Sequence, residues 1–545
     1  MPKPTAPPAP LPDACDVVIV GAGFSGLYML HEARRLGLAA RVIEAGDGVG
    51  GTWHWNRYPG ARVDIESQEY SYSFSPELDA EWAWSERYAS QPELLAYLNH
   101  VADRFELRRD IQLATRVTAA IYDEAARRWR ISTDRGEQIS ARFCVMATGC
   151  LSTPKEPDIP GVESFAGPTF HTGRWPREGV RFAGQRVAVI GVGSSAIQSI
   201  PRIAEEAAHV FVFQRTANFS VPAHNGPPDP KLVEDWRVNR ERYREEARAS
   251  GFGIRYVDAS EALALQVAPD ERQAAYEERW ARGGFALIGA FADLIVDKAA
   301  NATAAQFVAQ KIRAIVEDPE VAELLVPKSY PIATKRLCVD TGYYATFNRD
   351  NVTLVDVSAA PIEEITPTGL RTARAAYDVD AIVFAIGFDA MTGALARIDI
   401  RGRGGAALKD AWAAGPRTYL GLMVAGFPNL FIVTGPGSPS VLANMALAIE
   451  QHVDWIAACI GDLTRRQLAA IEPTEAAQDA WVAHVNEVAE TTLFPLANSW
   501  YLGANIPGKP RVFMPYIGGL GVYREKCAEV AANGYEGFQL TSAAG

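Results

Sequence analysis

Residues 16–26 read DVVIVGAGFSG, a run of β-branched residues that ends in three closely spaced glycines. A helical pattern from Leu27 to Leu36 follows, so the stretch predicts a strand, a tight turn and a helix. In such a unit Gly21, Gly23 and Gly26 permit the turn, the approach of a pyrophosphate to the backbone and close packing of the helix. The helix N-terminus adds N–H donors and a positive dipole end. The stretch therefore predicts a dinucleotide-binding fold of the α/β class.

The next predicted strand, Ala40 to Ile43, strengthens this interpretation because it ends at Glu44. A carboxylate in this place can accept hydrogen bonds from the two hydroxyls of a ribose. The first unit is therefore predicted to bind an adenosine diphosphate without a 2′-phosphate, as in FAD.

A second unit repeats the pattern, since residues 186–196 read RVAVIGVGSSA and a helical pattern from Ile197 to Ala207 follows. Alanine in place of the third glycine is a tolerated variant. Two such units predict two Rossmann-like domains that hold two dinucleotides. The cofactor contacts predicted in the second unit are Gly191, Gly193, Ser194, Ser195 and Gln198.

The second strand of this unit, His209 to Phe213, ends in Gln214-Arg215-Thr216 rather than in an acid. An acid would repel a 2′-phosphate, whereas a guanidinium can bind one with charge-assisted hydrogen bonds. The second unit is therefore predicted to prefer NADPH over NADH. The alternative is that Arg215 is an exposed arginine without a special role.

Composition excludes several classes of function. The formal charge of −12 over 545 residues gives no general attraction to nucleic acid or acidic membranes. The longest apolar stretch, residues 284–296, contains Asp293 and is too short to span a bilayer. The six cysteines show neither metal-ligand spacing nor a disulfide framework, and the N-terminus lacks a signal sequence. The expectation is a cytoplasmic protein without a bound metal.

Patterning along the chain predicts an inserted helical subdomain, which we expect to cover the substrate side of the active site. Its densest charges, residues 235–248, are typical of a solvated helix face. The predicted divisions are a disordered leader (residues 1–14), an FAD-binding domain (15–150 and 383–545), an NADP-binding domain (151–221 and 325–382) and the helical insertion (222–324).

Two long motifs connect the units. Residues 165–176 read FAGPTFHTGRWP and fit F-x-G-x-x-x-H-x-x-x-W-P, and residues 50–64 read GGTWHWNRYPGARVD and fit [A/G]-G-x-W-x-x-x-x-[F/Y]-P-[G/M]-x-x-x-D. On these motifs the chain resembles the Baeyer-Villiger monooxygenases, and residues 58–74 and 435–445 are similar to the phenylacetone, steroid and cyclohexanone enzymes. The signature positions are Phe165, Gly167, His171, Trp175 and Pro176.

The resemblance implies an enzyme that uses NADPH and O2 to convert ketones to esters or lactones through a flavin C4a-peroxide. A fixed cation must then stabilise negative charge in a site that contains little water. By resemblance this cation is Arg336, in ATKRLCVD of residues 333–340, and Asp64 pairs with it. A monomer or weak homo-oligomer is expected.

The other residue roles also rest on the resemblance. Lys335, Arg215 and Thr216 correspond to contacts of the 2′-phosphate loop, and Trp500 to a contact of the nicotinamide nucleotide. His171 is expected to serve the moving linker and not to act as a base. The flavin-lining positions are Thr52, Trp53, Tyr70 and Met445, and the substrate-pocket positions are Leu151, Val441 and Leu442.

Three alternatives remain open at the level of sequence. A flavin-containing monooxygenase that oxidises sulfides or amines shares both glycine-rich units, but its signature typically lacks the Trp-Pro ending and the Asp64 motif. A disulfide reductase needs a close redox cysteine pair, whereas five residues lie between Cys144 and Cys150. A non-enzymatic flavoprotein would not need Arg336 beside Asp64. The sequence leaves cyclic, aryl-alkyl and steroidal ketones equally open as substrates.

Overall fold

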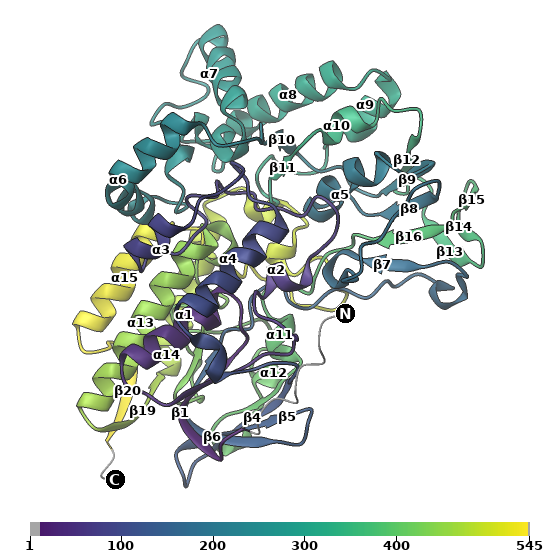
Figure 1. Cartoon of the computed structure of the whole chain (residues 1–545). Coiled ribbons are helices and arrows are strands. Elements are labelled where there is room, and N and C mark those ends of the chain that lie inside the picture. The colour runs from purple at the N-terminus through teal and green to yellow at the C-terminus, as the bar shows by residue number, and fades with distance from the viewer. Residues whose placement is uncertain (1–10, 543–545) are drawn as a thin grey trace.

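The computed structural model describes residues 11–542 and contains two main sheets, a mixed one in which β5 runs antiparallel to both of its neighbours and a parallel one, with a helical insertion above them (Figure 1). Most of the predicted leader lies outside the described residues. The first strand, β1, already begins at Ala14, so the predicted leader is one residue too long.

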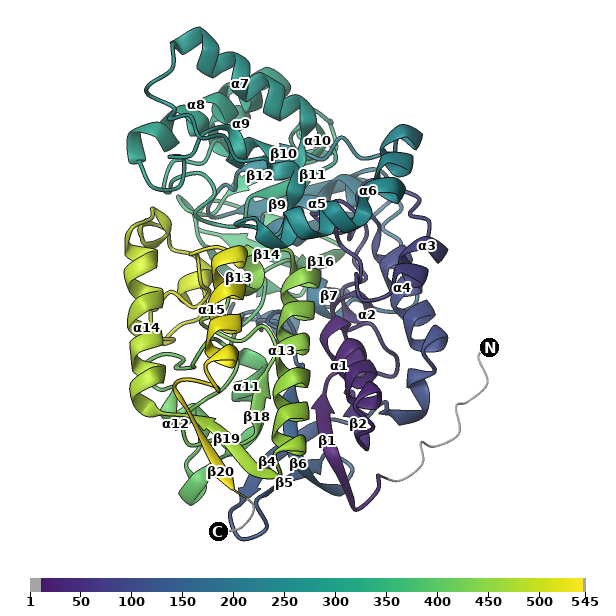
Figure 2. The same ribbon diagram turned by 90° about the vertical axis from the view of Figure 1, so that its left-hand side faces the viewer.

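The larger sheet has the order β17-β4-β5-β6-β1-β2-β3, with β18 paired to the end of β6. The helices α1 and α13 pack together against this sheet (Figure 2). Its strands are β1 (Ala14–Val20), β2 (Ala40–Ile43), β3 (Ile111–Gln112), β4 (Val117–Asp123), β5 (Arg128–Thr133), β6 (Gln138–Met146), β17 (Asp399–Arg401) and β18 (Leu430–Ile432). The other elements of this half are α1 (Phe24–Arg35), α2 (Thr52–Trp55), α3 (Pro76–Glu81), α4 (Gln91–Arg104), α11 (Gly393–Ala396), α12 (Leu408–Ala411), α13 (Met445–Arg465), β19 (Leu468–Pro473), α14 (Glu475–Glu490), α15 (Leu520–Ala532) and β20 (Phe538–Ser542).

The smaller sheet has the order β12-β9-β8-β16-β7, and all its pairings are parallel. β16 runs past residue 382, where we placed a domain boundary. The elements of this half are β7 (Thr169–His171), β8 (Arg186–Ile190), α5 (Ser194–Ala204), β9 (His209–Gln214), β12 (Val352–Asp356), β13 (Ile362–Thr366), β14 (Gly369–Thr372), β15 (Ala376–Asp378) and β16 (Ala381–Phe384).

The two nucleotide units use the same packing at their first glycine. Gly21 and Gly191 have φ values of +107° and +110°. A Cβ atom on Gly21 would lie 2.5 Å from the carbonyl oxygen of Ala147, and one on Gly191 would lie 2.4 Å from that of Ala385. Each turn therefore needs glycine both for its backbone conformation and for its close approach to the segment that follows β6 or β16.

The insertion begins and ends at one place, because β10 (Ser220–Pro222) pairs with β11 (Cys338–Asp340). Between them lie α6 (Pro230–Ala249), α7 (Pro269–Arg282), the 3-10 helix η5 (Gly284–Ala290), α8 (Lys298–Ile315) and α9 (Pro319–Leu325), and α10 (Tyr343–Thr346) follows β11.

The expectation of a solvated charged helix at residues 235–248 is wrong for one face of α6. Arg244 is buried and donates to the carbonyl oxygen of Ser71 at 3.1 Å and to its hydroxyl at 2.7 Å. Its guanidinium also lies 5.2 Å from the ring centroid of Trp236. The helix thus packs on the larger nucleotide unit, a tertiary contact that local charge density does not reveal.

All six cysteines are buried and free, so Cys144 and Cys150 form no disulfide with each other. No helix within residues 11–542 is long and apolar enough to cross a membrane. The same residues contain no cluster of histidine, cysteine or carboxylate side chains placed to hold a metal ion.

Candidate active site between the two nucleotide units

The Arg336 guanidinium forms a two-pronged ion pair with Asp64. Nε lies 2.9 Å from one carboxylate oxygen and a terminal nitrogen lies 2.8 Å from the other. The remaining terminal nitrogen donates to the carbonyl oxygen of Val441 at 2.8 Å. Such a fork fixes the plane of the guanidinium as well as its position. The structure thus brings together three segments that are far apart in the sequence.

The surroundings of Arg336 keep it charged. Burial lowers the pKa of the guanidinium, but the carboxylate of Asp64 raises it, and the net result is a raised pKa. The ring of Phe285, from η5, lies 4.8 Å from the guanidinium carbon. The buried hydroxyl of Tyr501 also interacts with the guanidinium. Arg336 is therefore a permanent cation held between a carboxylate and aromatic rings.

The loop that carries Asp64 rests on α5 of the smaller unit. A Cβ on Gly60 would lie 2.2 Å from the carbonyl oxygen of Gln198, so only glycine permits this approach. The Gln198 carboxamide accepts from the hydroxyl of Tyr58 at 2.9 Å and donates to the carbonyl oxygen of Arg62 at 3.1 Å. Gln198, predicted as a cofactor contact, is thus engaged in joining the two nucleotide units. Sequence reasoning missed this role because the partners are more than 130 residues away.

The predicted substrate and flavin positions near Arg336 share one apolar cluster. Val441 is buried in this cluster, and the partly buried side chains that pack against it include Leu151, Leu442, Met445 and Trp500. The backbone of Val441 contacts Arg336 directly. The side chains of Arg336 and Asp64 are each 25% exposed, so apolar residues line only part of their surroundings.

The first nucleotide unit has the features that an adenosine diphosphate and a flavin require. Glu44 accepts from the backbone N–H groups of Ala22 at 2.7 Å and Gly46 at 2.6 Å, which places its carboxylate beside the glycine-rich turn. Burial raises the pKa of Glu44. The indole N–H of Trp53 is buried without a partner, and Trp53 packs edge-on against Tyr70 with ring centroids 5.9 Å apart. Thr52 lies exposed beside it. An unpartnered buried donor of this kind fits a bound cofactor.

The second unit leaves a backbone cradle open. A Cβ on Gly193 would meet no heavy atom within 4 Å, so the space at the N-terminus of α5 can admit a pyrophosphate. The two serines after it contact protein groups. Ser194 lies 3.3 Å from the thiol of Cys338, and Ser195 donates to the hydroxyl of Thr172 at 3.1 Å. The cradle is thus also tied to the motif of residues 165–176.

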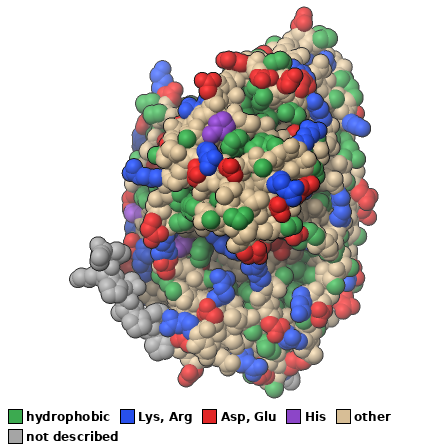
Figure 3. All heavy atoms as spheres, turned by 90° about the vertical axis from the view of Figure 1, so that its right-hand side faces the viewer, with side chains coloured by type: hydrophobic (Ala, Val, Ile, Leu, Met, Phe, Trp, Pro, Cys, Tyr) green, Lys and Arg blue, Asp and Glu red, His purple; other side chains and the backbone are tan. Residues whose placement is uncertain are grey.

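Two cations of the second unit, Arg215 and Lys335, lie close enough to influence each other electrostatically. Arg215 follows the end of β9 and is exposed, as expected for a residue that meets a ligand. Lys335 lies with its ammonium 4.4 Å from the ring centroid of Tyr330. Burial, and next the positive charge of Arg215, lower the pKa of Lys335. Figure 3 shows the right-hand face of the view in Figure 1, which is hollowed and has both basic and acidic side chains around the hollow.

The signature positions have separate structural roles. Phe165 is partly buried and packs against the core of the smaller unit, and a Cβ on Gly167 would lie 2.6 Å from the carbonyl oxygen of Asp380. His171 ends β7, where its Nδ1 accepts from Gly173 at 2.9 Å and its Nε2 is buried without a partner. Burial lowers the pKa of His171. Trp175, followed by Pro176, is buried against Phe170.

Comparison with known proteins decides the family. A protein-family model with the description pyridine nucleotide-disulphide oxidoreductase matches residues 18–238. A Baeyer-Villiger monooxygenase from Pseudooceanicola batsensis is 42% identical over 95% of this chain and 95% of its own length. An acetone monooxygenase from Gordonia sp. (strain TY-5) is 42% identical over 96% of this chain and 99% of its own length. A solved structure of a steroid monooxygenase bound to NADP is 55% identical and has a TM-score of 0.93. The match covers 97% of this chain and 100% of that chain. The chain belongs to the Baeyer-Villiger monooxygenases.

One buried acid of this Baeyer-Villiger monooxygenase was missed by sequence reasoning. Glu69, beside Tyr70, is 3% exposed and accepts from the backbone N–H of Arg255 at 3.0 Å. Its carbonyl oxygen accepts from the side chain of Asn444, which caps α13 immediately before Met445. The only local signal was an asparagine before a helical pattern. Glu69 therefore links the flavin-lining segments to the insertion.

We expect Glu69 to make stability depend on pH. Burial raises the pKa of its carboxyl from 4.5 to about 7. The folded state holds this proton more tightly than the unfolded state does. The resulting contribution of Glu69 to the free energy of unfolding is therefore present below pH 4.5 and is lost as the pH rises through 7. Glu69→Gln should flatten the fall in Tm between about pH 5 and 8. Thermal unfolding of both proteins across this range checks it, and parallel curves would contradict the assignment.

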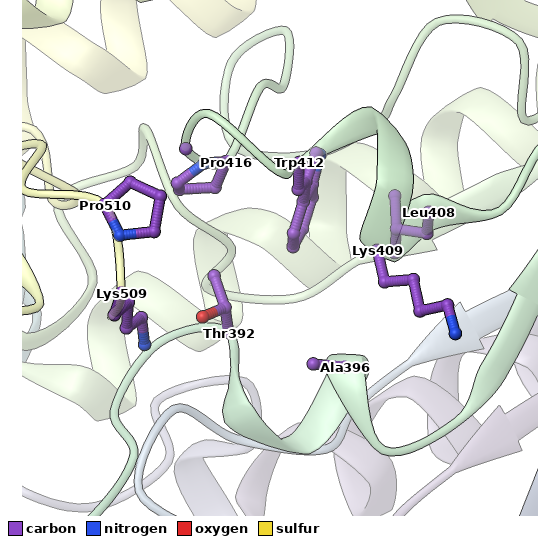
Figure 4. Close-up of a pocket in the computed structure, with 9 residues that line it drawn as sticks. Thr392, Ala396, Leu408, Lys409, Trp412, Pro416, Lys509 and Pro510 are labelled. Atoms are coloured by element: carbon purple, nitrogen blue, oxygen red, sulfur yellow. The ribbon is translucent and has the colours of Figure 1, made fainter. Parts of the chain in front are cut away.

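Two surface cavities lie elsewhere in the larger nucleotide unit. One, of about 110 Å³, lies between Trp412, Pro416, Lys509 and Pro510 (Figure 4). The other, of about 170 Å³, is bordered by Trp481 and other residues of the same half. Neither is lined by a residue that the sequence predicted for the site, so neither is the predicted substrate pocket.

Proposed function

We propose that this protein uses FAD, NADPH and O2 to convert ketones to esters or lactones. The observation that carries the proposal is the two-pronged pair of Arg336 and Asp64, set among apolar residues where the two nucleotide units meet. Bound FAD, once reduced by NADPH, would supply the activated oxygen for insertion beside the carbonyl carbon.

The protein's own contribution to this reaction is charge and position. Arg336 offers a cation to the negative charge that develops on the substrate oxygen during oxygen insertion. Asp64 fixes the plane of the guanidinium and offsets the cost of holding a cation in a poorly hydrated place. The carbonyl oxygen of Val441 accepts a hydrogen bond from a further N–H group of Arg336. Leu151 and Leu442 would exclude water and hold the apolar part of a ketone.

We infer that Arg215 and Lys335 set the choice of nucleotide by binding the 2′-phosphate. Replacing Arg215 by alanine should raise the KM for NADPH more than that for NADH, by roughly the 1.5–3 kcal/mol of a hydrogen bond to a charged group. Steady-state kinetics with both nucleotides check this. Equal increases for the two nucleotides would rule out the 2′-phosphate assignment.

We propose that the substrate is a ketone of the cyclic, aryl-alkyl or steroidal class. The relatives reported above are named for acetone and for steroids, which differ widely in size. A panel of the three classes, assayed for NADPH consumption and ester formation, would select among them. Ester from none of them would reject all three classes.

We further propose the domain divisions given above, with the second NADP segment extended to Phe384, and a cytoplasmic monomer or weak homo-oligomer. The parallel pairing of β16 with β7 and β8 supports the extension. The six free thiols fit a reducing compartment. Size-exclusion chromatography with light scattering would measure the mass of the protein in solution. A stable tetramer would contradict the expectation of a monomer or weak homo-oligomer.

A further inference from the structure

A third cation, Lys155, which the motifs do not assign, lies close enough to Arg215 to be influenced by its charge. Lys155 follows β6 in the segment that crosses to the smaller unit. Its backbone N–H donates to the carbonyl oxygen of Gly387 at 3.0 Å, and the neighbouring Pro154 forms a bridge with Phe388. These contacts fix the backbone of Lys155 beside the carboxyl end of β16.

The order of the smaller sheet relates this position to Arg215. β16 neighbours β8, which ends at the open cradle of Gly193, and β8 neighbours β9, which precedes Arg215. Adjacent strands are about 4.8 Å apart, so two steps span about 10 Å. The long stem of lysine suits it to reach across the cradle. Consistent with this, burial and then the charge of Arg215 lower the pKa of Lys155.

The three cations lack a matching anion in the protein. Within residues 11–542, none of Arg215, Lys335 and Lys155 forms an ion pair with a carboxylate. Asp158 acts on Lys155 only as a weaker influence than Arg215, and the neighbouring Glu156 is paired with Arg174. A cluster of like charges raises the free energy of the protein unless an anion binds there.

We propose that Lys155 is a third contact for the 2′-phosphate of NADP and contributes to the preference for NADPH. The pyrophosphate already has the N–H donors at the start of α5, whereas the 2′-phosphate is the terminal dianionic group that three cations would neutralise. This inference rests on the proposed use of NADPH and adds a residue to it.

Binding of small probes tests the assignment without turnover. Calorimetric titration of the oxidised, FAD-loaded protein would compare 2′,5′-ADP with 5′-ADP, which lacks the 2′-phosphate. Lys155→Met should weaken binding of 2′,5′-ADP about tenfold and change that of 5′-ADP by less than about twofold. Lys155→Arg should retain most of the affinity, and Lys409→Met, an exposed lysine on α12, is the matched control.

An unchanged affinity of Lys155→Met for 2′,5′-ADP would overturn the proposal, as would an equal loss for both probes, which would indicate the pyrophosphate. If Lys155→Met does not retain FAD, Lys155→Gln replaces it, and an affinity of that variant for 2′,5′-ADP within about twofold of the unmodified protein would overturn the proposal. Failure of the unmodified protein to discriminate between the probes would instead reject the proposed NADPH preference itself.

Discussion

Arg336→Ala is expected to reduce ester formation by more than a hundredfold while flavin reduction by NADPH continues. The loss of one preorganised group that stabilises developing charge costs roughly 3 kcal/mol or more of activation free energy. The variant also leaves Asp64 as a poorly compensated acid among apolar residues. Reduction requires only alignment of the two cofactors, so electrons from NADPH should appear as hydrogen peroxide instead of ester.

The two half-reactions can be measured separately on this variant. Anaerobic mixing with NADPH reports flavin reduction, and chromatography of the aerobic reaction reports ester. Arg336→Lys retains the charge but not the two-pronged geometry, so it should recover only part of the activity. Substantial ester from Arg336→Ala would remove this residue from the mechanism.

Gly26→Ala is expected to abolish FAD binding and to leave little soluble protein. The new Cβ would lie 1.8 Å from the carbonyl oxygen of Gly21 and 2.9 Å from its carbon. Both are backbone atoms of the first turn, so the helix α1 would have to move away from β1. The absorbance ratio of flavin to protein in the purified sample measures the result. A yellow, fully loaded Gly26→Ala protein would contradict the role given to this glycine.

Gly193→Ala is the matched control in the second unit. Gly193 has a φ of −78°, which alanine adopts freely, and its Cβ would meet no heavy atom within 4 Å. This variant should fold and retain FAD, but its methyl group occupies the cradle, so NADP should bind at least about tenfold more weakly. If Gly193→Ala lost FAD as well, the effect of Gly26→Ala could not be attributed to its own steric clash.

Local sequence was sufficient to predict both nucleotide units. In each unit a buried strand, a glycine turn and a helix are adjacent in the chain. The acid Glu44 in the first unit and the base Arg215 in the second distinguish the two predicted nucleotide sites by charge. The comparisons confirm the two-dinucleotide fold and the family predicted from residues 50–64 and 165–176. Arg336 and Asp64 are 272 residues apart in the sequence. Their ion pair could therefore be expected only from the resemblance to the family.

Contacts between distant segments account for what the sequence did not reveal. The charged run around Arg244 indicated a solvated helix, yet its guanidinium is buried against Ser71. The carboxamide of Gln198 joins Tyr58 and Arg62 of the other unit, a role that the sequence did not reveal beside the predicted cofactor contact. Charge density and motif position describe local chemistry, whereas these roles depend on which surfaces meet after folding.

The most direct test of the account uses oxygen-18-labelled O2. The FAD-loaded protein would be given NADPH, a ketone from the reactive class and labelled O2, and the product would be examined by mass spectrometry. We expect one oxygen-18 atom in each ester molecule, placed between the former carbonyl carbon and its neighbour. NADPH oxidation that yields only hydrogen peroxide with every ketone class, or an ester without the label, would contradict it.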